Sequence, residues 1–357
     1  MNANLGDACA NGVAHEGTIL EVGSRVIVAW DNDNPAAGSM PEGDARTYIS
    51  QQYRAQLDGI VDTLTATYGA PSDRDANGRV VVFVTSAVNA LAPPASTSYV
   101  SALHHSRDQL DQARCATSNV GEIVYALAPD PTGRVNGNVR SNAFVLGNLS
   151  PLVVELTHLA IDSSRLALAA PSFHPAWLDE ALAFTGSEWA FYQRTSLAPG
   201  SNIDLSTLTT GPNASARIAA FNTFENPIFG AARPGLQQPH QQGFFGATAS
   251  SGVQRGAGAQ FLRYAADRLP GAQTSFFTSL AAAPSTGLPA LDVVLGTDSK
   301  LWLRDFLIAR YTDDLLATSA VYRLPSWHYR SVYGGLGGFP LRIDQLGSNV
   351  ATPMTLA

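Results

Sequence analysis

Apolar residues recur three or four positions apart in several stretches of the chain, which is the periodicity of a helix with one buried face. The clearest stretch, 45–68, predicts a long amphipathic helix. The same spacing predicts helices at about 152–169, 177–194, 257–269, 272–283 and 299–311, and a short helix at 214–223. Apolar runs predict strands at 25–30, 80–85 and 121–128, and a short strand at 339–343.

Three stretches show neither the apolar spacing of a helix nor the apolar run of a strand. Residues 1–23 are polar and glycine-rich, which predicts a tail that leads into the first strand. Residues 89–117 contain two adjacent prolines and the pair His104-His105, and we expect an irregular segment with both histidines in a surface loop. Residues 225–256 are rich in glycine and glutamine, and we expect a long exposed excursion there.

The composition restricts the class of protein. The chain has 357 residues, of which 45% are hydrophobic and 14% charged, so it can bury a sizeable core as one large domain or two. Its net charge of −7 argues against nucleic acid or an anionic membrane as a partner. No apolar run reaches the length of a transmembrane helix, and no basic-then-apolar leader is present in the given chain.

The chain has two cysteines, Cys9 and Cys115. Two thiols are too few for a disulfide-dense scaffold. They form either one bridge, which would tie the N-terminal segment to a distant loop, or two free buried thiols. The sequence by itself leaves both alternatives open.

The stretch 152–194 carries the residues with the most specific chemistry. Glu155 and His158 are three positions apart, hence on one face of the first predicted helix, and Glu180 lies near the start of the second. In the pattern H-E-x-x-H, two histidines on one helix face bind zinc and the glutamate acts as general base. Val154 stands at the position of the first histidine, and valine has no lone pair to donate. The alternative is a polar helix face with one histidine that binds no metal.

A second motif precedes the strand 80–85. Asp73, Asp75 and Asn77, followed by Gly78, resemble the opening of a calcium-binding loop. An EF-hand loop needs a glutamate at its twelfth position, where this chain has Val84. The pattern therefore indicates either a calcium turn or a tight turn that feeds the strand.

Several separated stretches resemble the hyicolysin-like family of secreted bacterial zinc metallopeptidases. They are DRDANGRVVVFVTSAVN at 73–89, CATSNVGEIVYALAPDPTGRVNGNVRS at 115–141, VVELTHLAIDSSRL at 153–166 and WLDEALAFTGSEWAFYQRTSLAP at 177–199. The resemblance implies an α+β fold of the zincin type, with a small twisted sheet over an active-site helix and a mostly helical C-terminal part. With it we expect an N-terminal tail at 1–23, a sheet-containing subdomain at 24–150, the active-site helices at 151–200, a helical subdomain at 201–335, and a short strand and tail at 336–357.

By position, the resemblance makes Glu155 the general base and makes His158 and Glu180 ligands of zinc, with Val154 at the position of the lost ligand. His174, in the loop between the two helices, is the candidate for a replacement ligand. The alternative for His174 is an exposed loop histidine that binds no metal, because metal geometry tolerates little misplacement.

The departures from the family pattern are clustered at the positions expected to bind zinc and next to them. Besides Val154, the glycine that follows the ligand glutamate in the family is Ala181 here. We therefore expect a pseudopeptidase with weak or absent zinc, a binding or scaffold role, and a protein or peptide ligand in a groove. One alternative is an active zinc-dependent endopeptidase, or another metallohydrolase, with an altered ligand set. A purely structural cell-surface module is the other.

The resemblance also bears on location and on the cysteines. A secreted bacterial family implies an extracellular or cell-surface protein, and we expect a monomer. In that setting a bridge between Cys9 and Cys115 is the expected pairing, and it would stabilise the fold by about 3–5 kcal/mol in the loop-entropy model.

Overall fold

The computed structural model describes residues 9, 12–169, 172–237, 252–316 and 319–336. The chain divides into two compact units. The N-terminal unit comprises Met1–Phe173 and Phe277–Pro284, and the C-terminal unit comprises His174–Phe276 and Ser285–Ala357. The first unit contains a sheet and helices and the second is helical, so the fold class is α+β, as predicted. The boundary after Phe173 separates the two helices that were expected to carry the active site.

The N-terminal unit is built on a five-stranded sheet with the order β1-β2-β5-β7-β6. Its strands are β1 (Gly17–Val22), β2 (Val26–Asp31), β5 (Val80–Thr85), β7 (Ile123–Leu127) and β6 (Ala102–His104). The three central strands β2, β5 and β7 are parallel, and the edge strands β1 and β6 are antiparallel to their neighbours. A small separate hairpin is formed by β3 (Ser39–Met40) and β4 (Gly43–Asp44).

The three predicted central strands are confirmed, and their boundaries differ by at most two residues from those expected. Their valine-rich runs are buried, which is typical of parallel strands covered by other elements. The prediction of a tail over 1–23 is wrong for Gly17–Val22, which forms β1. The apolar side chains of β1 are largely exposed, with Ile19 60% and Val22 57% accessible, so this edge strand lacks the burial pattern that reveals the others.

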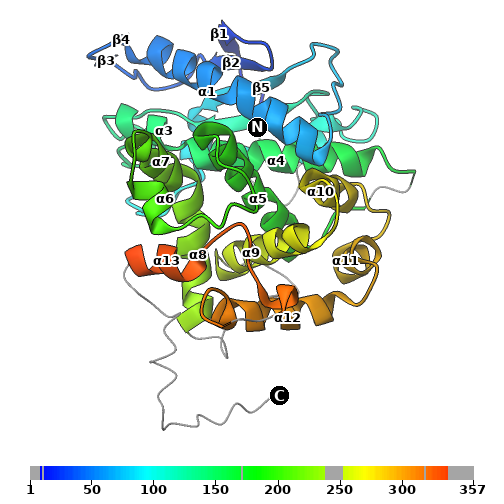
Figure 1. Ribbon diagram of the computed structural model, residues 1–357. Helices are drawn as coiled ribbons and strands as arrows, with labels where there is room; N and C mark the ends of the chain where they lie inside the picture. The colour runs from blue at the N-terminus through cyan, green and yellow to red at the C-terminus, as the bar shows by residue number, and fades with distance from the viewer. Residues whose placement is uncertain (1–8, 10–11, 170–171, 238–251, 317–318, 337–357) are drawn as a thin grey trace. The chain divides into compact units, whose positions relative to one another are not determined.

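Two long helices lie on one face of this sheet (Figure 1). α1 (Ala45–Tyr68) contacts β2 and α4 (Leu149–Leu166), and α4 contacts β6 and β7. α1 has the predicted bounds: the Asp44 side chain accepts a hydrogen bond from the Thr47 amide at 2.9 Å, which caps the first turn. Its buried residues recur three or four positions apart, so one face of the helix packs against the sheet. The shorter helical segments of this unit are α2 (Ser86–Asn89), η1 (Ser106–Gln109) and α3 (Asn142–Gly147).

Cys9 and Cys115 form a disulfide, so the prediction of this bridge is confirmed. Cys115 is buried, with 1% of its surface accessible, in the segment that precedes β7. The bridge therefore fixes the segment before β1 to the interior of the same unit.

The C-terminal unit consists of helices. They are α5 (Ala176–Thr195), α6 (Leu205–Thr209), α7 (Ala214–Ala220), the π-helical turn η2 (Phe221–Glu225), α8 (Asn226–Gln237), α9 (Gly252–Arg268), α10 (Gln273–Ala281, whose end belongs to the N-terminal unit), α11 (Gly287–Leu295), α12 (Ser299–Thr312), η3 (Ala320–Tyr322) and α13 (Tyr329–Gly335). α9 packs between α5 and α8 (Figure 1). Where α9 meets α5, a Cβ on Gly258 would lie 2.6 Å from the Ala181 Cβ. The methyl group of Ala181 is thus accommodated by a glycine on the facing helix.

The prediction of an exposed excursion over 225–256 is wrong for all its described residues. Glu225 ends η2, residues 226–237 form α8, and residues 252–256 form the first turn of α9. Ile228, Phe229, Ala232 and Leu236 are buried on one face of α8. Two glycines and two prolines within it conceal the helical signal. The strand predicted at 339–343 lies outside the described residues.

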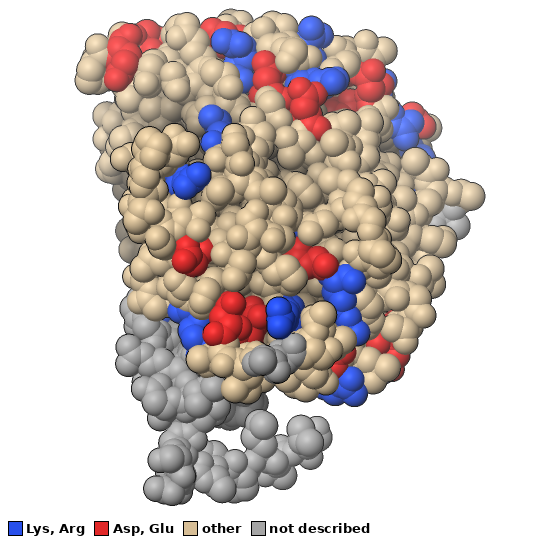
Figure 2. Space-filling view, in the orientation of Figure 1, with Lys and Arg blue, Asp and Glu red and all other residues tan. Residues whose placement is uncertain are grey.

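Among the described residues, no helix has both the length and the apolar character needed to span a bilayer. On the face drawn in Figure 2, basic and acidic side chains lie interspersed in small groups.

Candidate functional site

Val154, Glu155 and His158 lie on one face of α4, as the sequence predicts. All three are partly exposed, whereas their neighbours Val153 and Leu156 are buried in the core. Positions i, i+1 and i+4 point to the same side of a helix, so the three side chains form one partly accessible strip.

The Glu155 carboxylate is fixed at the edge of the sheet. Its Oε2 accepts a hydrogen bond from the His104 backbone amide at 2.7 Å. His104 ends the edge strand β6, whose outer amides have no further strand to pair with in the described sheet. One oxygen of Glu155 is therefore oriented by the main chain, which gives this carboxylate a defined position for binding or proton transfer.

The expectation that His104 and His105 lie in a surface loop is wrong. β6 pairs with β7 and carries His104 into the interior, where its side chain is 2% accessible. Its Nδ1 lies 3.2 Å from the Ile123 carbonyl and its Nε2 lies 3.2 Å from Asp162 Oδ2. Both ring nitrogens are therefore engaged in contacts that position the ring.

His105, at the next position, is partly buried. Its Nε2 is buried and has no hydrogen-bond partner among the described residues. Burial, and next the positive charge of Arg107, lower the pKa of His105 to about 4. The ring is therefore neutral at pH 7.

In the C-terminal unit, Glu180 lies near the start of α5 beside a positive charge from the chain itself. The Glu180 Oε2 is 3.5 Å from the Arg255 Nε of α9, and both side chains are partly exposed. Arg255 also lies over the ring of Phe184, with 6.0 Å from its guanidinium carbon to the ring centroid. Nothing in the local sequence pattern connects Arg255 to Glu180, 75 positions away, so the sequence does not reveal this partner.

His174 is the first residue of the C-terminal unit and precedes α5. The alternative of an exposed loop histidine is wrong, because only 6% of its surface is accessible. Its role as a metal ligand stays a prediction. So does the approach of Glu180 to Glu155 and His158, because these residues belong to different units.

A third carboxylate, from outside the sequence motif, lies beside the predicted calcium turn. Asp73, Asp75 and Glu122 each offer an oxygen, and the three oxygens lie within 4.8 Å of one another. Glu122 is 1% accessible and directly precedes β7, whose Ile123 pairs with Val81. Only the register of the parallel strands brings Glu122 to the turn, so sequence spacing could not reveal it.

The side chain of Asn77 is engaged in hydrogen bonds within the turn. Its side-chain amide donates to Asp75 Oδ2 at 2.5 Å, and its Oδ1 accepts from the Arg79 backbone amide at 2.6 Å. Asn77 therefore shapes the turn, and the three carboxylates would supply the ligands of a cation.

A second group with metal-ligating atoms within 4.8 Å of one another consists of His15, Asp31 and Asp33. His15 Nδ1 lies 2.9 Å from Asp31 Oδ2, and Asp31 also accepts a hydrogen bond from the Thr85 hydroxyl at 2.5 Å. The buried Asp31 thus has partners at the end of β2 without a metal.

No protein-family model and no curated protein matches this chain. The family resemblance therefore depends on the sequence stretches quoted above.

Proposed function

We propose that the protein is a pseudopeptidase of the hyicolysin-like type: a secreted zincin-fold protein that binds a protein or peptide and does not hydrolyse it. The observation that carries the proposal is the ion pair between Glu180 and Arg255. In this assignment Glu180 is the carboxylate ligand of zinc. A guanidinium 3.5 Å away supplies part of the positive charge that the metal would bring.

The α4 residues support the same proposal. Val154 removes one imidazole donor, which leaves His158 and Glu180 as the assigned ligands. Structural and catalytic zinc sites alike use at least three protein ligands, so two ligands should hold zinc weakly. Glu155, held by the His104 amide, remains as an oriented acceptor for a polar group of a bound partner. The disulfide supports the proposed extracellular location, because bridges persist in oxidising compartments.

The proposal is tested by restoring the donor and removing the competing charge. We expect the parent protein to lose zinc on dialysis. Val154→His should raise zinc affinity, and Val154→His with Arg255→Gln should raise it further, because the second change removes a positive charge beside the ligand carboxylate. Val154→Leu is the matched control, since it keeps the size class at this position and adds no lone pair.

Metal analysis after dialysis, calorimetric zinc titration and casein digestion are the measurements. If the parent protein retains stoichiometric zinc and digests casein until a chelator is added, the proposal is wrong and the altered-ligand metallohydrolase takes its place. If the double variant binds zinc no better than Val154→Leu, the zincin assignment of these residues is wrong. Calcium binding at Asp73, Asp75 and Glu122 is a separate prediction.

A further inference from the structure

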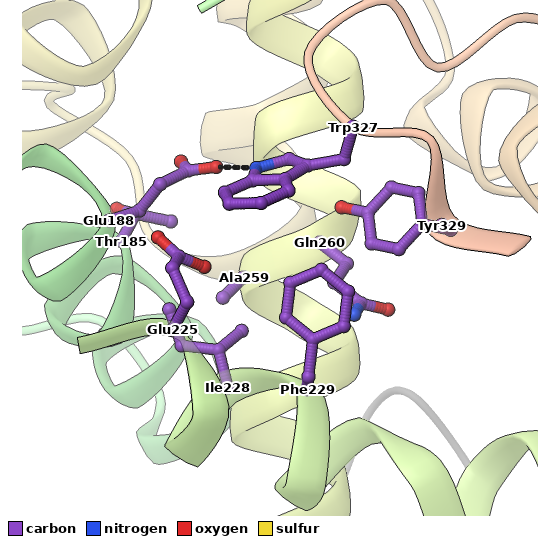
Figure 3. Close-up of a pocket in the computed structure, with 9 residues that line it drawn as sticks. All are labelled: Thr185, Glu188, Glu225, Ile228, Phe229, Ala259, Gln260, Trp327 and Tyr329. Carbon is purple, nitrogen blue, oxygen red and sulfur yellow. Dashed lines mark hydrogen bonds between the residues drawn. The ribbon is translucent and has the colours of Figure 1, made fainter. Parts of the chain in front are cut away.

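The C-terminal unit encloses a cavity of about 10 Å³, which is room for one water molecule. Among the residues that line it are Glu188 of α5, Glu225 at the end of η2, Gln260 of α9, and Trp327 and Tyr329. Figure 3 shows the Glu225 carboxyl group and the Tyr329 hydroxyl group facing the same space beneath the Trp327 indole. Two acidic residues, Glu188 and Glu225, therefore share a small enclosed site.

Glu188 is well stabilised as an anion. Its Oε1 accepts a hydrogen bond from Trp327 Nε1 at 2.8 Å and lies 3.2 Å from the Tyr192 hydroxyl. Its Oε2 accepts from Arg263 Nε at 2.6 Å. Both oxygens of Glu188 are therefore occupied, and its bond with the Arg263 guanidinium is of the stronger, charge-assisted kind.

Glu225 lacks comparable partners. Glu225 is buried, with 1% of its surface accessible. Its Oε1 has no hydrogen-bond partner among the described residues. Arg263 is already engaged by Glu188, by Gln273 Oε1 at 2.7 Å and by Asp267 at 3.7 Å. An isolated buried carboxylate is strongly disfavoured in its charged form. Burial, and next the negative charge of Glu188, accordingly raise the pKa of Glu225 well above its ordinary value.

Gln260 contributes a second buried acceptor. The Tyr333 hydroxyl lies 3.2 Å from the Phe229 carbonyl, which can only accept, so the single Tyr333 proton is used there. Tyr333 must therefore accept the hydrogen bond from Gln260 Nε2, at 3.0 Å, and this fixes the orientation of the amide. The Gln260 Oε1 is then a buried acceptor without a partner in the described part of the chain.

We infer that the cavity is a proton-binding site, in which Glu225 stays protonated at neutral pH and donates to one water molecule that in turn donates to Gln260. A neutral carboxyl group and one water satisfy the two acceptors without placing a second negative charge beside Glu188. Ionisation of Glu225 would leave two neighbouring anions in the interior, so the folded unit holds this proton to a higher pH than the unfolded chain does. The helical unit therefore becomes less stable as pH rises from the unfolded pKa of Glu225 toward its folded pKa, which makes the unit sensitive to pH.

The charges around Glu225 support this assignment. α5 contributes Glu188 and Tyr192, α9 contributes Arg263 and Asp267, and α13 contributes Tyr329 and Tyr333. On the neighbouring helices α7 and α8, Arg217 donates to the Thr207 carbonyl and Arg233 to the Leu336 carbonyl. The positive charge of Arg263 lowers the pKa of Glu225, but this guanidinium is shared with Glu188 and Asp267.

The test compares the full-length protein with Glu225→Gln in urea unfolding at a series of pH values. A carboxyl group whose folded pKa is raised stabilises the fold below the unfolded value of 4.5, and this stabilisation is lost as pH rises toward the folded pKa. Glutamine cannot ionise, so the unfolding constant of the parent relative to the variant should rise about tenfold per pH unit above that value. Asp267, whose pKa is raised to about 6 chiefly by burial, is present in both proteins. Glu42→Gln, at an exposed carboxylate, is the control and should give a ratio independent of pH.

A ratio for Glu225→Gln that does not change between pH 5 and pH 8 would overturn the inference. A stabilisation of the parent by sodium or calcium chloride that Glu225→Gln abolishes would also overturn it, because a metal ion and not a proton would then neutralise the site. If Glu225→Gln does not fold, infrared spectroscopy of the parent decides. A protonated carboxyl band that persists at pH 7 supports the inference, and its absence refutes it.

Discussion

Removal of the disulfide tests how the N-terminal unit is held together. The bridge joins residues separated by 106 positions, and the closed loop contains β1, β2, α1, β5 and β6. A cross-link over so long a loop removes a large part of the conformational freedom of the unfolded chain. For a loop of this length, the loop-entropy relation gives a stabilisation of about 4.8 kcal/mol.

The double variant Cys9→Ala with Cys115→Ala should therefore unfold at markedly lower urea concentration than the oxidised parent. Cys115 is 1% accessible, so its replacement also removes a buried sulfur, which adds about 1 kcal/mol to the loss. The reduced parent keeps both sulfurs and separates the two contributions. It should lose about 4–5 kcal/mol of unfolding free energy relative to the oxidised parent.

The double variant itself provides the control, because a reductant should leave its unfolding unchanged. A loss below about 2 kcal/mol on reduction of the parent would refute the loop-entropy reasoning. Such a result would mean that the bridge only fastens the segment before β1, which then detaches while the sheet stays folded. Hydrogen exchange confined to that segment would identify this outcome.

Two further changes probe other polar groups. Arg263→Met removes the cation between Glu188 and Asp267, and breaking a buried pair in this way should cost about 3–5 kcal/mol of unfolding free energy. Arg25→Met removes a half-exposed ion pair with Asp62 and should cost at most about 1 kcal/mol of unfolding free energy. Equal losses of unfolding free energy for the two variants would contradict the argument that burial makes an ion pair costly to break. If Asp73, Asp75 and Glu122 bind calcium, calcium chloride should raise the melting temperature and Asp75→Asn should abolish the rise, whereas no rise in the parent would favour the tight turn.

The hydrophobic pattern of the sequence predicts those helices and strands whose buried residues follow the regular spacing of one element type. α1 and the three central strands satisfy this condition and were predicted almost to the residue. β1 and α8 do not. The apolar side chains of β1 face solvent at the sheet edge, and α8 contains residues that weaken a helix but is held by the packing of its apolar face against α9. Tertiary contacts decide these elements, and a single sequence does not contain those contacts.

The candidate site shows the same limit. The spacing of Glu155 and His158 correctly placed both residues on one face of α4, because that relation is local. Glu122 reaches the Asp73 turn through strand register, and Arg255 reaches Glu180 through the packing of two helices. His104 enters the interior because β6 pairs with β7. Each of these partners is far away in the sequence, so none follows from a motif.

These non-local partners bear on how a zinc site of this type could lose its metal. A carboxylate that no longer binds zinc still needs compensation, since its negative charge would otherwise lack a partner. In the proposed assignment, the His104 amide provides a donor to Glu155 and the Arg255 guanidinium provides a charge for Glu180. Restoring a histidine at position 154 supplies a ligand but leaves Arg255 in place. Zinc affinity should therefore recover only in part until that guanidinium is also removed, and a full recovery with Val154→His alone would show that the ion pair has no influence on the metal.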